Sequence, residues 1–220
     1  MSRPHTGWLA VGLLLCAGCA EQAQLRRSLA QPYHPANIHQ SASRLPPGLR
    51  RVAVLPLTTE GKEALAQAGC ATLEPILLAE LRKRAAFEVV VVSREQLRAW
   101  TGQPGWRQED TLPAGLLAKV QDYTGCQGIL FDHLSVYRPY PPLGVGWRLS
   151  LIDCADRATC WTVDEVFDAG SPAVIKAAQT YFRSQMNQPS VELDSTAVLT
   201  SPRRFGQYTA AAALGTLPAR

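Results

Sequence analysis

Few residues in the part of the chain that should fold could support catalysis. His133 is the one histidine beyond residue 50, so a Ser-His-Asp or Cys-His arrangement would have to use it. It falls in a predicted strand, where alternation places it on the sheet surface. Asp164 and Glu165 are neighbours on another predicted strand and so face opposite sides, which rules them out as a glycosidase pair. The sequence predicts no catalytic residue and a protein that is not an enzyme.

Metal, nucleotide and nucleic-acid sites are equally unsupported. The cysteines beyond residue 19 contain no C-x-x-C pair, and nothing near His34 and His39 completes a metal site. The chain has no P-loop motif, and Gly144-Val145-Gly146 precedes a strand, not a helix, so no cofactor is predicted. The formal charge is +4, or +3 without Arg3, which is too weak to indicate a nucleic-acid partner.

The N-terminus carries a chemistry of its own. Arg3 precedes an apolar run, residues 8–15, which is too short to span a bilayer. Ala17 and Gly18 then precede Cys19, and this resembles the lipobox of bacterial lipoproteins, with Cys16 where that pattern usually has Leu. The resemblance implies that a signal peptide, residues 1–18, is removed and that Cys19 is acylated, which anchors the chain to a membrane. Ala20, and not Asp, follows the cysteine, and the resemblance to Gram-negative lipoproteins then implies the periplasmic face of the outer membrane, with inner-membrane anchoring left open.

Export to an oxidising compartment would allow the remaining cysteines to pair. Cys154 and Cys160 flank a short loop at the tip of a predicted hairpin, so we expect a disulfide between them. Cys70 and Cys126 would then pair by elimination, the alternative being buried free thiols.

The elements that position these residues follow from periodicity. Residues 19–50 are polar and rich in proline, which indicates a flexible tether after the acylated cysteine. A domain is predicted for residues 51–187, and residues 188–220 form a C-terminal extension with a helix at about 202–213. Apolar or alternating runs predict five strands, and periodic or capped segments between them predict helices. The strands are expected at 51–57, 87–92, 128–137, 146–154 and 159–167, and the helices at 61–69, 72–84, 93–101, 111–123 and 171–187.

Strand and helix alternate in the first half, which favours parallel pairing, whereas the second half is a meander, which favours antiparallel pairing. We therefore predict an α/β (α+β mixed) fold with a single mixed sheet of about five strands packed by helices.

Several segments resemble one family. They are RVAVLPL, LLAELRK, FEVVVVS, YTGCQGILFDHL and WRLSLIDCADRATCWTVDE, followed by an amphipathic helix. Together they resemble the TolB-N-terminal-like domain of PelC-, CsgG- and LpoB-like periplasmic lipoproteins, over roughly residues 51–187. The resemblance transfers architecture better than activity. It implies protein partners in an envelope assembly, with self-assembly into a ring as one form.

The predicted turn between residues 137 and 143 is the strongest interaction feature. Tyr137, Arg138 and Tyr140 lie on a stiff, proline-rich segment ending at Leu143, with Trp147 close behind. Tyrosine and arginine are enriched at interface hot spots, and stiffness lowers the ordering cost of binding. A turn folded over its own core is the alternative interpretation.

These observations give a leading hypothesis and two alternatives. The first is a non-enzymatic, lipid-anchored periplasmic protein that serves as an accessory or scaffold in polysaccharide or protein export, or in cell-wall synthesis. The alternatives are a glycan- or small-ligand-binding lipoprotein and an envelope hydrolase, which a pocket joining His133 to a nucleophile would support.

Overall fold

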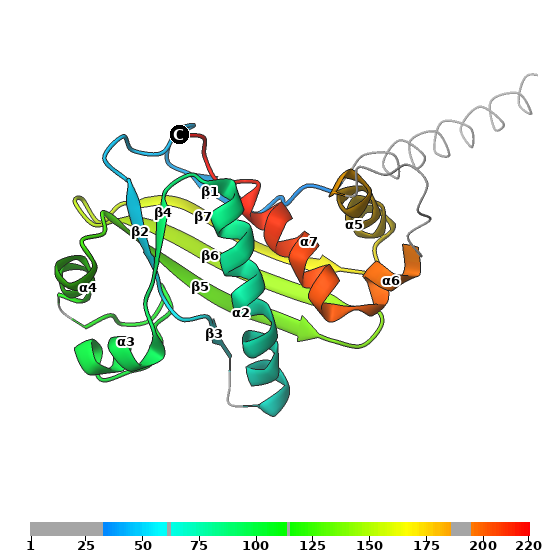
Figure 1. The fold of residues 1–220 in the computed structure, drawn as a ribbon, viewed down its shortest axis with the longest axis horizontal. Coiled ribbons are helices and arrows are strands. Elements are labelled where there is room, and N and C mark those ends of the chain that lie inside the picture. The colour runs from blue at the N-terminus through cyan, green and yellow to red at the C-terminus, as the bar shows by residue number, and fades with distance from the viewer. Residues whose placement is uncertain (1–32, 61–62, 114, 186–194) are drawn as a thin grey trace, which may run out of the picture.

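A seven-stranded mixed sheet organises the chain (Figure 1). The structure is a computed structural model that describes residues 33–60, 63–113, 115–185 and 195–220. The strand order is β1-β7-β6-β5-β2-β4, and β3 pairs with β5. The strands are β1 (Ile38–Gln40), β2 (Arg51–Val54), β3 (Thr58–Thr59), β4 (Glu88–Val91), β5 (Gly128–Arg138), β6 (Gly144–Asp153) and β7 (Thr159–Asp168). The predicted class is confirmed, and the two strands that the sequence analysis missed, β1 and β3, have only three and two residues.

The predicted directions of pairing are confirmed. The strands β4, β2 and β5 run parallel, because a helical crossover separates each from the next in sequence. The strands β5, β6 and β7 pair antiparallel through short connections. Residue pairing in this meander places Leu149 of β6 opposite Asp132 of β5 on one side and Val163 of β7 on the other.

Helices cover both faces of the sheet. They are α2 (Ala64–Arg84), α3 (Arg94–Thr101), α4 (Leu116–Thr124), α5 (Pro172–Gln185), α6 (Ser195–Thr200) and α7 (Pro202–Leu214). α3 begins at the predicted capping box, in which the Ser93 side chain accepts from the Gln96 N–H and the Gln96 side chain accepts from the Ser93 N–H. It ends at Gly102, and α4 ends at Gly125, both in left-handed conformation.

One continuous helix replaces the two predicted for residues 61–84. α2 runs through Pro75, and the Thr72 hydroxyl bonds back to the Ala68 carbonyl instead of capping a new helix. α2 is long and apolar enough to cross a membrane by composition. Leu73 and Leu77 are nevertheless fully buried against the sheet and α7, so its apolar face is already used in the core.

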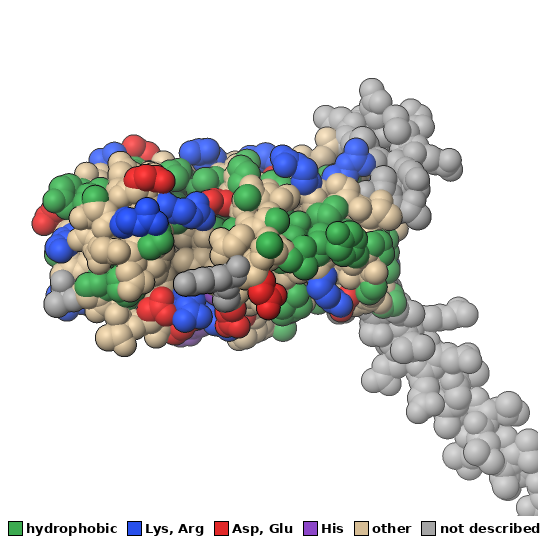
Figure 2. Space-filling model, turned by 90° about the horizontal axis from the view of Figure 1, so that it is seen from below, with side chains coloured by type: hydrophobic (Ala, Val, Ile, Leu, Met, Phe, Trp, Pro, Cys, Tyr) green, Lys and Arg blue, Asp and Glu red, His purple; other side chains and the backbone are tan. Residues whose placement is uncertain are grey.

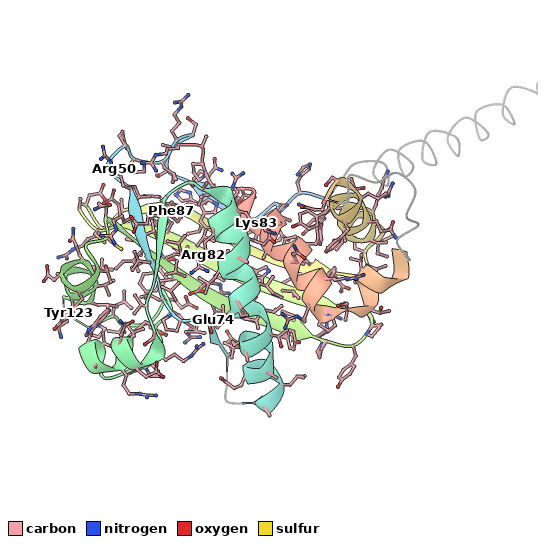
Figure 3. All side chains as sticks on the ribbon, viewed as in Figure 1. Arg50, Glu74, Arg82, Lys83, Phe87 and Tyr123 are labelled. Carbon is pink, nitrogen blue, oxygen red and sulfur yellow. The ribbon has the colours of Figure 1, made fainter. Side chains whose placement is uncertain are left out.

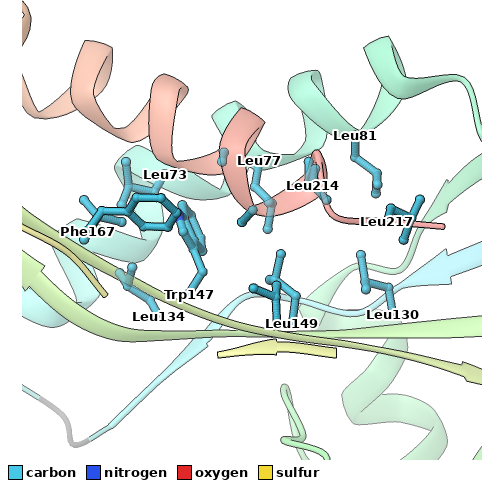
Figure 4. Packing of buried hydrophobic residues seen from close by; sticks show 14 of the residues in the cluster. Leu73, Leu77, Leu81, Leu130, Leu134, Trp147, Leu149, Phe167, Leu214 and Leu217 are labelled. Atoms are coloured by element: carbon cyan, nitrogen blue, oxygen red, sulfur yellow. The ribbon is translucent and has the colours of Figure 1, made fainter. Parts of the chain in front are cut away.

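The larger core lies between the sheet and the pair α2–α7 (Figure 4). Leu73 and Leu77 of α2 and Leu214 of α7 meet side chains that point up from the sheet, among them Trp147 and Leu149. The helix predicted at about 202–213 is present as α7, but it belongs to the domain and not to an extension, because its buried residues complete this layer. A smaller cluster on the other face packs under α3, α4 and Trp106.

Residues 33–50 also belong to the folded unit, although the sequence analysis placed them in the tether. β1 pairs with β7, and Leu45 and Leu49 are buried. The Leu45 N–H donates to the carbonyl of Ala219 at 2.8 Å, which joins this segment to the C-terminal residues. Cys19 and the predicted signal peptide lie outside the described residues.

Candidate functional site

The turn between β5 and β6 projects from one end of the sheet. Tyr140 is 76% exposed at its tip, and Pro141 and Pro142 follow it. Figure 2 shows hydrophobic side chains gathered at this end of the molecule, while charged side chains of both signs are mixed over the rest of the face. Two further hydrophobic side chains are exposed on the elements next to β5 and β6, namely Leu65 on α2 and Val166 on β7.

Contacts on several sides fix this turn. Arg138 Nη2 donates to Asp168 Oδ2 at 2.7 Å, and the Gly170 N–H donates to Asp168 Oδ1 at 2.7 Å. These two donors hold the pKa of the Asp168 carboxyl below its ordinary value, with the Gly170 N–H contributing most. The ring of Tyr137 packs so closely on Gly69 of α2 that an added Cβ would lie 2.7 Å from it. The turn is therefore held in place before any partner binds.

The predicted interaction surface is smaller than the sequence indicated. Leu143 and Trp147 are both fully buried, because Leu143 turns back under the hairpin and Trp147 points into the α7 side of the core. Tyr137 is half-buried, and Arg138 forms an ion pair with Asp168. Of the predicted surface residues, only Tyr140 is exposed and without a partner. A contact at this end would therefore centre on Tyr140 and be flanked by Arg138.

His133 is buried, so its predicted place on an exposed sheet surface is wrong. It is 2% exposed, beneath the loop that carries Trp106 and Arg107. Thr58 Oγ1 lies 3.0 Å from His133 Nδ1 and donates its proton to the Asp132 carbonyl, also at 3.0 Å. Because a hydroxyl has one proton, Nδ1 must be the donor in the first contact. In that tautomer Nδ1 carries the ring proton and Nε2 is the unprotonated nitrogen, which has no hydrogen-bond partner among the described residues.

Ion pairs surround His133, and their carboxylates outnumber their arginines. Arg148 donates to both Asp164 and Glu109, at 2.9 Å and 2.8 Å, and Arg107 pairs with Asp110. Burial is the main cause that lowers the pKa of His133. A hollow of about 750 Å³ lies beside Thr58 and is lined by Glu60, Arg107 and Asp110 among others. Asp164 and Glu165 do face opposite sides, with Glu165 bonded to Tyr33.

A buried carboxylate on the opposite face escaped the sequence analysis. Asp132 is fully enclosed, and neither of its carboxylate oxygens has a partner among the residues that the structure describes. Burial, followed by the negative charge of Glu74, raises its pKa well above the ordinary value. Glu74, labelled on α2 in Figure 3, pairs with Arg94 at 2.8 Å. The one signal in the sequence is an aspartate that follows four apolar residues of the predicted strand, directly before His133.

A second hollow, of about 510 Å³, lies where the N-terminal segment meets α5 and α7. Tyr33, Tyr181 and Tyr208 contribute to its lining. Tyr208 is 3% exposed, and its hydroxyl has no hydrogen-bond partner within the described part of the chain. This aromatic lining could not be predicted, because it combines residues about 170 positions apart.

The four cysteines within the described ranges carry free thiols. Cys160 belongs to the core under α2 and α7, whereas Cys154 packs against the cluster on the other face. The predicted Cys154–Cys160 disulfide is thus absent, and the two thiols lie on opposite sides of the sheet. Cys70 lies near Arg94, Glu74 and Asp132 on the α2 side, and Cys126 is buried on the α4 side, so that predicted pair is also separated by the sheet.

No group of three or more His, Cys, Asp and Glu side chains in the described ranges could hold a metal ion. The described residues offer a braced, exposed turn, an aromatic hollow and a cluster of ion pairs around a buried histidine.

Comparison with known proteins finds matches among solved structures and none by sequence. No protein-family model matches this chain, and no curated protein matches it either. Among solved structures, the PelC dodecamer of Paraburkholderia phytofirmans matches with a TM-score of 0.45 at 16% identity, covering 83% of this chain and 96% of that one. Lipoprotein GNA1162 of Neisseria meningitidis matches with a TM-score of 0.41 at 13% identity, covering 64% and 99%. The LpoB C-terminal domain of Salmonella enterica matches with a TM-score of 0.32 at 16% identity, covering 54% and 82%.

All three matches have TM-scores below 0.5, and one of the three proteins, GNA1162, is described as a lipoprotein. At such identities the similarity concerns fold, so the function is argued from this chain's own residues.

Proposed function

We propose that this protein is a non-enzymatic lipoprotein of the bacterial envelope that docks a protein partner through the β5–β6 turn. Acylation at Cys19 would hold it on the periplasmic face of the outer membrane. The settings that the sequence resemblance implies are export of a polysaccharide or protein, and cell-wall synthesis. The partner is another component of such an assembly or a neighbouring copy of this chain.

The observation that carries the proposal is the exposure of Tyr140 on a turn that is already fixed. Ordering a flexible loop on binding costs free energy. Here the Arg138–Asp168 ion pair and the Tyr137–Gly69 contact already order the turn in the free protein, so a partner would bind without this loss. A tyrosine presents a large, rigid contact area together with a polar hydroxyl, which suits a protein interface.

The mechanism is confinement. A tether between Cys19 and the folded unit keeps the turn within a short distance of the membrane, so that binding to a membrane-associated partner becomes effectively intramolecular. The chain would act by raising local concentration and by orienting its partner, with no chemical step of its own.

Site-specific crosslinking in cells tests the docking site. A photoreactive phenylalanine analogue placed at position 140 should yield a discrete adduct with an envelope protein or a second copy, identified by mass spectrometry. The matched control is position 123, because Tyr123 is also exposed but lies on α4 and stacks on Trp100 with ring centroids 4.7 Å apart. Equal adducts at both positions, or none at 140, would contradict the proposal.

The anchor is tested separately. Incorporation of labelled palmitate should occur in the native chain and be lost in Cys19→Ala. Intact, unprocessed protein in the cytosol of the native host would overturn the envelope assignment whatever the crosslinking result.

The ligand-binding alternative is favoured by one observation, the hollow that Tyr33, Tyr181 and Tyr208 help to line. Aromatic rings of this kind stack on sugars and other planar or apolar ligands. Glycan binding that is lost in Tyr208→Phe or Tyr33→Ala, yet kept in Tyr140→Ala, would favour this function over docking at the turn. Loss of glycan binding in Tyr137→Ala and Tyr140→Ala would instead make the turn itself a glycan site.

A further inference from the structure

The arrangement of the sheet brings together two cysteines that the sequence did not pair. The Cys154 N–H donates to the Gln127 carbonyl at 2.8 Å, just beyond Gly128 and Asp153, the last pair of the β5–β6 ladder. This single bond holds the backbones of residues 127 and 154 side by side at the end of the hairpin. Cys126 directly precedes Gln127, and its thiol is close enough to that of Cys154 to interact with it electrostatically. A disulfide requires Cα atoms about 4.4–6.8 Å apart, which neighbouring positions on hydrogen-bonded backbones can meet.

Both side chains also lie on the same face. Gly125 ends α4 with φ of 66°, and this turn directs Cys126 into the cluster under α3 and α4. Cys154 packs against that same cluster from the end of β6. The other two thiols are elsewhere, since Cys70 and Cys160 belong to the core on the α2 side.

We propose that Cys126 and Cys154 form a disulfide when the protein meets a disulfide donor. The bond would close residues 126–154 into a loop and join the end of α4 to the end of β6. It depends on the proposed export only for its oxidant, because the pairing itself is set by the fold.

Exchange with an oxidised dithiol or glutathione donor supplies the chemistry. The thiolate of Cys154, which is half-buried and therefore the accessible member, attacks a donor sulfur and releases one donor thiol. The thiolate of Cys126 then attacks Cys154 Sγ, and the second donor thiol leaves. Two protein thiols lose two protons and two electrons, and the donor disulfide gains them.

The ionisation of Cys154 sets the pH dependence of this exchange. Burial raises the pKa of the Cys154 thiol to about 11, and the charges of Asp153 and Cys126 raise it further in smaller measure. Because the thiolate is the attacking species, the rate of exchange should rise with pH from 7 towards 9.

Trypsin separates the cysteines, so the pairing can be determined directly. Cleavage after Lys62, Arg82, Lys119, Arg148, Arg157 and Lys176 places the four thiols in peptides 63–82, 120–148, 149–157 and 158–176. Arg138 is followed by proline and resists cleavage, and the two N-terminal cysteines fall in another peptide. The reduced full-length protein is incubated with oxidised glutathione, alkylated and digested without reductant.

The expected product is a link between peptides 120–148 and 149–157. Oxidation should raise the melting temperature by roughly 5–10 °C, through the smaller entropy of the unfolded chain. The Cys70→Ala/Cys160→Ala double variant should keep both the link and the shift, and Cys154→Ala should lose both.

Three outcomes would overturn the proposal. The first is a link between peptides 149–157 and 158–176, which joins Cys154 to Cys160. The second is a link between peptides 63–82 and 120–148, which joins Cys70 to Cys126. The third is recovery of Cys126 and Cys154 only as alkylated or glutathione-bound thiols. Because the assay uses purified protein, these results are independent of whether the chain is acylated or exported.

Discussion

Trp147 Nε1 donates a hydrogen bond to Thr209 Oγ1 at 2.9 Å inside the core, which joins the middle strand of the meander to the C-terminal helix. Both residues are fully buried, so no water can replace a lost partner. The bond places a polar pair where the sheet and α7 must align, and it makes the register between them specific.

Thr209→Val should therefore destabilise the fold by about 1–3 kcal/mol, because the buried indole N–H would be left without an acceptor. Urea unfolding measures this change. Thr180→Val is the matched control, since the Thr180 hydroxyl is exposed and bonds only within α5. Equal losses in the free energy of unfolding of the two variants would show that the hydrogen bond to Trp147 does not stabilise the fold.

Asp132→Asn should stabilise the protein at neutral pH. The folded-state pKa of Asp132 is raised by burial, so the unfolded chain loses its proton first as the pH rises above about 4. The free energy of unfolding of the native chain then falls with pH until the folded-state pKa is reached. The advantage of the variant should grow from pH 4 to 7 and reach about 1–3 kcal/mol.

The measurement for Asp132 is urea unfolding at several pH values, with Asp122→Asn as the control because Asp122 is exposed on α4. A gain in stability that is the same at pH 4 and pH 7 would contradict a buried carboxyl whose pKa is raised in the folded state.

Gly206→Ala should destabilise the packing of α7 on α2. An added Cβ at this glycine would collide with Leu73, which is itself fully buried. Overpacking of this kind costs about 1–3 kcal/mol. Gly48→Ala provides the comparison, because nothing lies within 4 Å of its added Cβ, and we expect a change within about 0.5 kcal/mol. Thermal unfolding that ranks the two variants the other way would refute the close approach of the helices.

Truncation after residue 185 should abolish cooperative folding. It removes α7, whose buried residues include Phe205, Tyr208 and Leu214. Burying each large apolar side chain contributes about 1.5–3 kcal/mol, and the total stability of a domain is only about 5–15 kcal/mol. Near-ultraviolet circular dichroism and a thermal scan test this. If the truncated chain still unfolds in one sharp transition, α7 is not needed for folding and is an appended segment and not part of the core.

Local patterns were sufficient wherever one segment determines its own conformation. The capping box at Ser93, the glycines that end α3 and α4, and the alternating hairpin strands were all predictable because their stabilising contacts lie within a few residues. The mixed sheet followed from the order of these elements.

Patterns failed where distant segments meet. The burial of His133 depends on a loop about thirty residues earlier, and the burial of Leu45 depends on the C-terminal residues. Cys154 and Cys160 seemed to be partners because they flank one loop. The ladder slips between Leu151 and Ile152, and Cys160 faces the side of the sheet opposite Cys154.

The sequence by itself determined the class of fold, the direction of pairing among the five predicted strands, the export signal that we infer and the exposed tyrosine turn, since each depends on residue type and short-range spacing. Only the tertiary structure decided which side chains share a face, that α7 belongs to the core, that Asp132 is enclosed without a partner and that Cys126 lies beside Cys154. Those relationships arise from packing between segments far apart in the chain, and no local periodicity encodes them.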